Sequence, residues 1–137
     1  MTTYLHAELT REIIGCFYHV YNQLGYGFLE KVYENSLAHE LRKRGMVAVQ
    51  QAPVEVWYDG LRVGEYYADL LVEDKVLVEL KSVSHLGDEQ MAQLLNYLTA
   101  TGKEIGLLLN FGPRPEVRRK VFQTARIIQY PIAQEQK

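Results

Sequence analysis

Residues 67–81 of this 137-residue chain read YADLLVEDKVLVELK, and this stretch decides the fold. Apolar and polar side chains alternate on both sides of Glu73-Asp74-Lys75, which predicts two half-buried strands joined by a tight turn. The apolar positions are all even-numbered, so a hairpin buries them on one face only when paired residue numbers add up to an even value. These positions are Leu70, Val72, Val76, Val78 and Leu80.

A turn centred on Asp74 places Asp69 directly opposite Glu79, with Cβ atoms about 4.5–5.5 Å apart. Lys81 lies two residues beyond Glu79 and therefore on the same face. Carboxylates this close repel each other, and Mg²⁺, which binds one or two carboxylates, would compensate their charge. Lys81 could then orient an attacking water or stabilise charge that develops on a phosphate. The alternative is a surface charge ladder in which Lys81 only neutralises Glu79.

Two helices are predicted before the hairpin. Apolar residues spaced by three and four predict the first from Leu9 to Leu24, and the glycines of Gly25-Tyr26-Gly27 end it. The second helix is expected from about Leu29 to Arg44. Its buried side should carry Val32, Leu37 and Leu41.

Strands are predicted on both sides of the deciding stretch. Residues 47–58 alternate with period two, Pro53 favours an edge position or a bulge, and Asp59-Gly60 is a strong hairpin signal. The return strand should cover residues 61–72, and the strand after it residues 76–83.

A third helix is expected over residues 88–101, and the apolar run 105–111 predicts a strand covered on both faces. Residues 117–132 should add a short strand. This order indicates one α/β domain over residues 1–137, with a mixed four-stranded core sheet flanked by helices.

Composition narrows the classes of function. The chain has 15 Lys+Arg, 17 Asp+Glu and a net charge of -2, so any nucleic-acid partner needs a local basic patch. No apolar run approaches the roughly 18 residues of a membrane helix. The single cysteine, Cys16, excludes an internal disulfide and a cysteine-built metal site. We therefore expect a soluble, cytoplasmic protein without a membrane partner.

Further motifs accompany the hairpin in a fixed order. Residues 27–33 read GFLEKVY, residues 93–97 read QLLNY and residues 106–112 read GLLLNFG. Together with Asp69 and the ELK of residues 79–81, this set resembles the GxxExxY proteins, a branch of the PD-(D/E)XK nuclease superfamily. The proline of that motif is Ala68 here, a change that does not touch the chemistry. The resemblance covers about residues 8–122.

The resemblance implies a restriction-endonuclease-like PD-(D/E)XK core and a Mg²⁺- or Mn²⁺-dependent nuclease that acts on DNA. It implies a metal held by Asp69, Glu79 and the Leu80 carbonyl, with Glu30 holding a metal water or a second ion. Lys81 would be the catalytic lysine. Gln93 and Tyr97 share a helix face and resemble the Q-x-x-x-Y element that RecB-type relatives place beside the scissile strand.

Several residues also have simpler interpretations. Glu30, near a helix start, could be only a partner of the helix dipole, but the motif favours the site. Tyr33 is interpreted as structural support, and His85 could reach the site. A basic stretch beyond the last core strand could grip phosphates or form a solvated face. It comprises Arg114, Arg118, Arg119 and Lys120, followed by Arg126.

The leading hypothesis is therefore a Mg²⁺- or Mn²⁺-dependent phosphodiesterase acting on DNA. A second is a catalytically silent module on the same fold that binds nucleic acid or protein, and a third is a structural dimerisation domain. The resemblance also implies a homodimer or a helicase-type partner, because small relatives of this kind often work in these ways.

Overall fold

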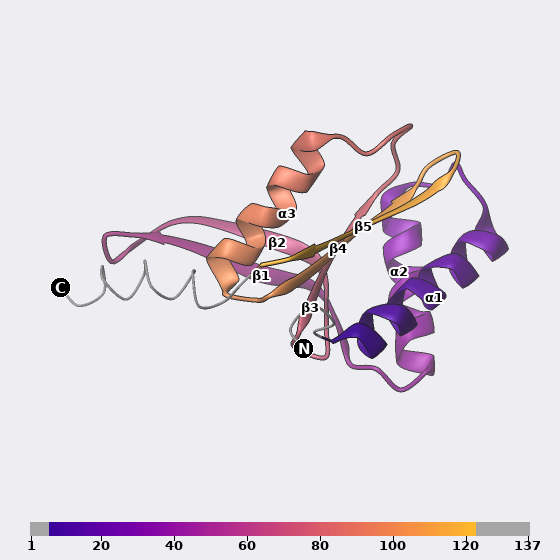
Figure 1. Cartoon of the computed structure of the whole chain (residues 1–137), viewed down its shortest axis with the longest axis horizontal. Coiled ribbons are helices and arrows are strands. Elements are labelled where there is room, and N and C mark those ends of the chain that lie inside the picture. Colours follow the sequence, from indigo (N-terminus) through magenta and orange to yellow (C-terminus); the bar gives the residue numbers. More distant parts are fainter. Residues whose placement is uncertain (1–5, 123–137) are drawn as a thin grey trace.

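The computed structural model describes residues 6–122 as a mixed α/β fold (Figure 1). Three helices and five strands form in the described part. In chain order they are α1 (Ala7–Leu24), α2 (Glu30–Lys43), β1 (Ala48–Tyr58), β2 (Leu61–Val72), β3 (Val76–Lys81), α3 (Asp88–Thr101), β4 (Ile105–Phe111) and β5 (Pro115–Val121). Within residues 6–122, no helix is both long and apolar enough to cross a bilayer.

The strands form one mixed sheet in the order β1-β2-β3-β4-β5. β3 and β4 are parallel and connected through α3, whereas all other neighbours are antiparallel. The mixed sheet is confirmed, but it has five strands instead of four because β5 pairs along the whole of β4. The predicted tail strand begins earlier, at Pro115, and residues 123–132 lie outside the described chain.

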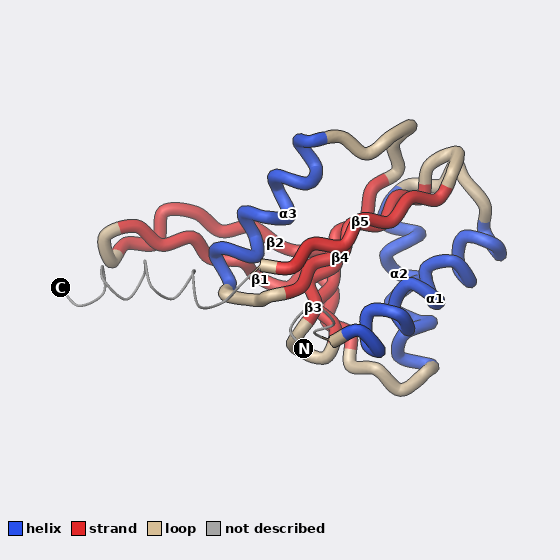
Figure 2. Tube along the Cα trace, in the orientation of Figure 1, coloured by secondary structure: helices blue, strands red, loops and turns tan. Residues whose placement is uncertain are grey.

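The helices cover both faces of the sheet (Figures 1 and 2). α1 and α2 pack on one face and form a core cluster with the five predicted hairpin residues, which are all buried: Leu70, Val72, Val76, Val78 and Leu80. α3 packs on the other face, where Leu94 and Leu98 contact a second cluster that includes Leu77 and Leu108. All of β4 is buried, which confirms the prediction of a strand covered on both faces.

The register of the central hairpin is the predicted one. Leu70 pairs with Val78 and Val72 with Val76, so the next position brings Asp69 opposite Glu79. The turn is also confirmed, because Glu73 and Asp74 adopt the left-handed conformation of a tight reversal. The strand that follows ends at Lys81 and not at Val83, because residues 82–84 leave the sheet.

One prediction about the helices is wrong. Val32 does not belong to the buried side of α2, since it is 37% exposed. Tyr33 takes that place and is fully buried together with Leu37 and Leu41. A tyrosine can fill a core position when its hydroxyl finds a partner, which the apolar count of the sequence did not consider.

β1 is an edge strand, as Pro53 indicated. Its alternation of buried and exposed residues changes partway along the strand, next to the β2–β3 hairpin. Ala48 contacts the cluster under α1 and α2, whereas Val54 contacts the cluster under α3. The change occurs around Gln51, whose φ of 53° interrupts the extended backbone. This break lies opposite Asp69, because Gln50 pairs with Leu70 and Ala52 with Ala68.

Candidate active site

The acidic pair lies where β2 and β3 separate. The backbone N–H of Asp69 donates to Glu79 Oε2 at 3.0 Å, and the N–H of Leu80 donates to Asp69 Oδ2 at 2.7 Å. Each carboxylate therefore accepts a main-chain donor of the opposite strand. This exchange replaces the ladder bonds and holds both side chains at one point. Glu79 is only 4% exposed, so this is not the surface ladder considered above.

Burial dominates the electrostatics of this pair. It raises the pKa of Glu79 to about 8, and the charge of Asp69 adds to the rise, while hydrogen bonding and Lys81 oppose it. Burial also raises the pKa of Asp69. Without a cation, the pair therefore retains a proton near neutral pH. A divalent cation would allow both carboxylates to ionise.

Lys81 is held beside the pair by α3. Its Nζ donates to Gln93 Oε1 at 3.1 Å, and Gln93 Nε2 donates to the hydroxyl of Tyr97 at 3.3 Å. Burial raises the pKa of Tyr97, the charges of Glu79 and Asp69 raise it further, and the hydrogen bond with Gln93 opposes the rise, so this hydroxyl lies near the acidic pair. Gln93 and Tyr97 thus share a face of α3, as their spacing predicted, and this face contacts Lys81.

Glu30 reaches the site from the first turn of α2. Partial burial raises the pKa of its carboxyl group, Lys81 lowers it and Asp69 raises it, and the backbone N–H of Ser82 donates to it. The Glu30 carboxylate therefore lies near Lys81 and Asp69. This position agrees with the site role more closely than with a helix-dipole partner alone.

Tyr33 holds the loop that presents Glu30. Its hydroxyl donates to the carbonyl of Gly25 at 2.6 Å and accepts the N–H of Phe28 at 3.1 Å. Its ring stacks on Phe111 of β4 with centroids 4.2 Å apart. Tyr33 is therefore structural support, as the sequence indicated.

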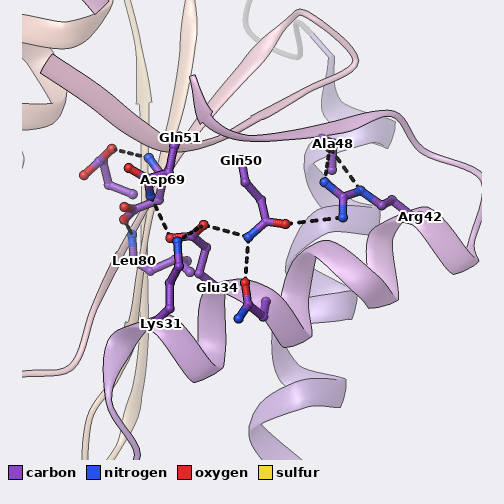
Figure 3. A network of polar contacts seen from close by, with 10 residues as sticks. Lys31, Glu34, Arg42, Ala48, Gln50, Gln51, Asp69 and Leu80 are labelled. Carbon is purple, nitrogen blue, oxygen red and sulfur yellow. Dashed lines mark hydrogen bonds and ion pairs between the residues drawn. The ribbon is translucent and has the colours of Figure 1, made fainter. Parts of the chain in front are cut away.

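Sequence reasoning missed Glu34 and Gln51. Glu34 is 4% exposed, and its two carboxylate oxygens accept hydrogen bonds from Lys31, Gln50 and Gln51 (Figure 3). The close-up places this network next to Asp69 and Leu80. Glu34 follows Glu30 by one helical turn, a spacing that could have indicated it. No spacing in the sequence indicates Gln51.

The segment after Lys81 is anchored by the GLLLNFG motif. Asn110 is fully buried, its Oδ1 accepts the N–H of Val83 at 2.9 Å, and its Nδ2 donates to the Val83 carbonyl at 2.9 Å. Gly112 packs against the same carbonyl so closely that no Cβ fits. The motif thus fixes the path of the chain that leaves the site.

Replacing Gly112 by alanine is therefore expected to lower the free energy of unfolding by about 1–3 kcal/mol, because the new Cβ collides with the Val83 carbonyl. Urea denaturation measures this loss. Gly15→Ala is the control, since Gly15 lies inside α1 with its nearest neighbour 4.0 Å away. This control should gain about 0.5–1 kcal/mol. Equal stability of Gly112→Ala and the wild type would contradict the expectation.

The basic stretch is divided between both faces of the sheet. Arg118 pairs with Leu108, which pairs with Glu79, so Arg118 lies on the face of the acidic pair, and Lys120 shares that face. Arg119 pairs with Leu107 and lies on the opposite face. Arg114 is in the exposed loop before β5, and Arg126 lies outside the described residues. Only two of the four predicted phosphate contacts therefore share the side of the site.

His85 is placed beside β5. Its Nδ1 lies 4.0 Å from Glu116 Oε2, and its side chain is highly exposed. The same Glu116 accepts a hydrogen bond from Asn110 at 2.8 Å. The contacts of His85 thus lead to the β4–β5 hairpin and not to the acidic pair.

The site contains carboxylate oxygens, the kind of ligand that a hard divalent cation prefers. Among residues 6–122, no three Asp, Glu, His or Cys side chains are grouped as a complete metal cage. Mg²⁺ does not need one, because it usually takes one or two carboxylates and completes its shell with water or phosphate oxygens. Burial, together with the charge of Asp69, raises the pKa of Glu79, and a bound cation would oppose both effects. The residues present therefore fit such an ion.

Comparisons with known proteins agree with this architecture. Residues 7–120 match the model of the PD-(D/E)XK nuclease superfamily. The crystal structure of SSO0001 is 19% identical with a TM-score of 0.50, covering 78% of this chain and 58% of that one. An alkaline exonuclease (LHK-Exo) from Laribacter hongkongensis is 14% identical with a TM-score of 0.51, covering 77% and 62%. The chain thus spans about three fifths of both structures. No curated protein sequence matches it.

Proposed function

Because the chain belongs to the PD-(D/E)XK nuclease superfamily, we propose that it is a metal-dependent nuclease that hydrolyses phosphodiester bonds in DNA. The observation that carries this proposal is the buried pair Asp69 and Glu79, cross-linked through backbone N–H groups, with Lys81 beside it. The motif of residues 27–33 further supports membership of the GxxExxY branch. The similar fold of an alkaline exonuclease is consistent with this function.

Asp69, Glu79 and the Leu80 carbonyl would hold Mg²⁺ or Mn²⁺, with Glu30 facing the same space. Such an ion would supply Lewis acidity and would lower the pKa of water. Water that loses its proton more easily is a better source of the nucleophile. Lys81, oriented by Gln93, would stabilise the negative charge that develops on the phosphate during in-line attack. Tyr97, on the same face of α3 as Gln93, would position the DNA strand that is cut.

A second candidate is a catalytically silent module that binds nucleic acid or protein. It is favoured by the net charge of -2 and by the fact that both carboxylates already accept main-chain hydrogen bonds. Such a module would bind DNA in a salt-dependent way without cutting it.

A cleavage assay on end-labelled single- and double-stranded DNA separates the two candidates. Wild-type protein is expected to cut in Mg²⁺ or Mn²⁺ and to lose the activity in EDTA. Asp69→Ala should also be inactive, because it removes a metal ligand. Cleavage that persists in EDTA or in Asp69→Ala would overturn the nuclease proposal. A gel shift without any cleavage would support the binding module.

A further inference from the structure

Gln51 has an unusual backbone for a residue within a strand. Its φ of 53° lies in the left-handed region, which costs a residue other than glycine about 1–3 kcal/mol. The neighbouring pairs, Gln50 with Leu70 and Ala52 with Ala68, place Gln51 opposite Asp69. A local cost of this kind persists only where the surrounding structure imposes it. The distortion therefore lies directly beside the acidic pair.

The side chain of Gln51 lies between two carboxylates, those of Glu34 and Asp69 (Figure 3). Its Nε2 donates to Glu34 Oε1 at 2.8 Å. Burial raises the pKa of Asp69, and a hydrogen bond from the Gln51 side chain opposes that rise. The amide nitrogen carries two hydrogens and is the only donor of this side chain, so one group serves both acids.

Glu34 provides a rigid end to this bridge. Its Oε2 accepts hydrogen bonds from Lys31 Nζ at 3.1 Å and from Gln50 Nε2 at 2.7 Å. Gln50 also accepts a hydrogen bond from Arg42 at 3.3 Å, so its contacts lead away from the site. Figure 3 shows Gln51, Asp69 and Glu34 grouped where the strands approach α2. The bridge thus ties Asp69 on β2 to a buried carboxylate on α2.

We propose that Gln51 is a positioning residue that orients the Asp69 carboxylate for cation binding. The N–H of Leu80 donates to Asp69 Oδ2 at 2.7 Å, and the side chain of Gln51 lies beside the same carboxylate (Figure 3). A ligand held in this way has little rotamer freedom left to lose when an ion binds. The left-handed backbone of Gln51 aims the amide between the two acids. This inference rests on the proposed function.

The test compares the same substitution at two neighbouring glutamines. Gln51→Asn tolerates the left-handed backbone but is one methylene too short to bridge both carboxylates. We expect its Mn²⁺ affinity, measured by isothermal titration calorimetry, to fall about 10–100-fold. Gln50→Asn shortens a contact to the same Glu34 and should keep the wild-type affinity within about twofold. Urea denaturation of both variants monitors the fold.

The outcomes of these measurements decide the proposal. Wild-type affinity in Gln51→Asn overturns the proposal, and so does an equal loss in both variants, because that indicates a general effect on Glu34. Gln51→Gly accepts the same backbone and removes the whole side chain, so it must lose at least as much affinity if Gln51→Asn does not fold. Asp69→Asn should abolish binding. If it does not, or if the wild type binds no Mn²⁺, the proposed metal site itself fails.

Discussion

Replacing Lys81 by methionine is expected to lower the rate of DNA cleavage by about 10²–10³-fold, as removal of one donor to a developing oxyanion does. Methionine keeps an unbranched stem of similar length, so packing against α3 should change little. The substitution removes the ammonium that donates to Gln93 Oε1 at 3.1 Å. Among the described hydrogen bonds, no other cationic side chain contacts the Gln93 face of α3. Gel quantification of product against time measures the effect.

The variant also separates catalysis from metal binding. Lys81 donates to Gln93 and not to the acidic oxygens in the described hydrogen bonds, so Lys81→Met should retain Mn²⁺ binding in calorimetry. Lys103→Met is the matched control, because Lys103 pairs with Asp74 at the far hairpin turn. It should cleave like the wild type. Full activity in Lys81→Met would remove Lys81 from the mechanism.

Replacing Glu79 by glutamine is expected to stabilise the metal-free protein at pH 8 while it abolishes cleavage. The folded-state pKa of Glu79 is raised to about 8 from a value of 4.5, so the neutral form is favoured in the folded chain. This contribution to stability is complete below pH 4.5 and decreases by about 1.4 kcal/mol per pH unit until it is lost near pH 8. Glutamine does not titrate, so the Glu79→Gln variant keeps this contribution to stability across the whole pH range.

The difference in the free energy of unfolding should therefore grow from near zero at pH 4 to a few kcal/mol at pH 8, on the order expected for a carboxylate buried beside another. Urea denaturation in EDTA across this range measures it. Mn²⁺ at pH 8 should raise the stability of the wild type and not that of Glu79→Gln. Glu55→Gln, at an exposed ion pair with Arg62, serves as control and should show no such trend. A difference that does not depend on pH would contradict the argument.

Much of the site could be predicted from one hairpin. The even-numbered apolar residues restrict the register to pairs with an even sum, and a turn centred on Asp74 then brings Asp69 opposite Glu79. The helical spacing of Gln93 and Tyr97 is equally local, which explains why their common face was predictable. Local periodicity determines such relations, because each depends on only one element or one turn.

The remaining features depend on contacts between distant segments. Glu34 and Gln51 meet across 17 positions, and the left-handed φ of Gln51 has no signature in a glutamine. Tyr33 replaced Val32 in the core because its hydroxyl finds partners in a loop that no spacing describes. Sequence proximity was also misleading for Arg118 and Arg119. Adjacent residues of a strand point to opposite faces, so one basic stretch became two separate surfaces.

The position of β5 affects how its basic residues can be studied. In the described sheet β5 has a neighbour on one side only, so its outer backbone groups could pair with another molecule. Arg118, Arg119 and Lys120 line this open strand, and repulsion between their charges opposes such self-association. Neutral substitutions there would promote aggregation, which a binding assay would record as lost affinity for DNA. Glutamate substitutions avoid this artefact, because they reverse the charge and keep molecules apart.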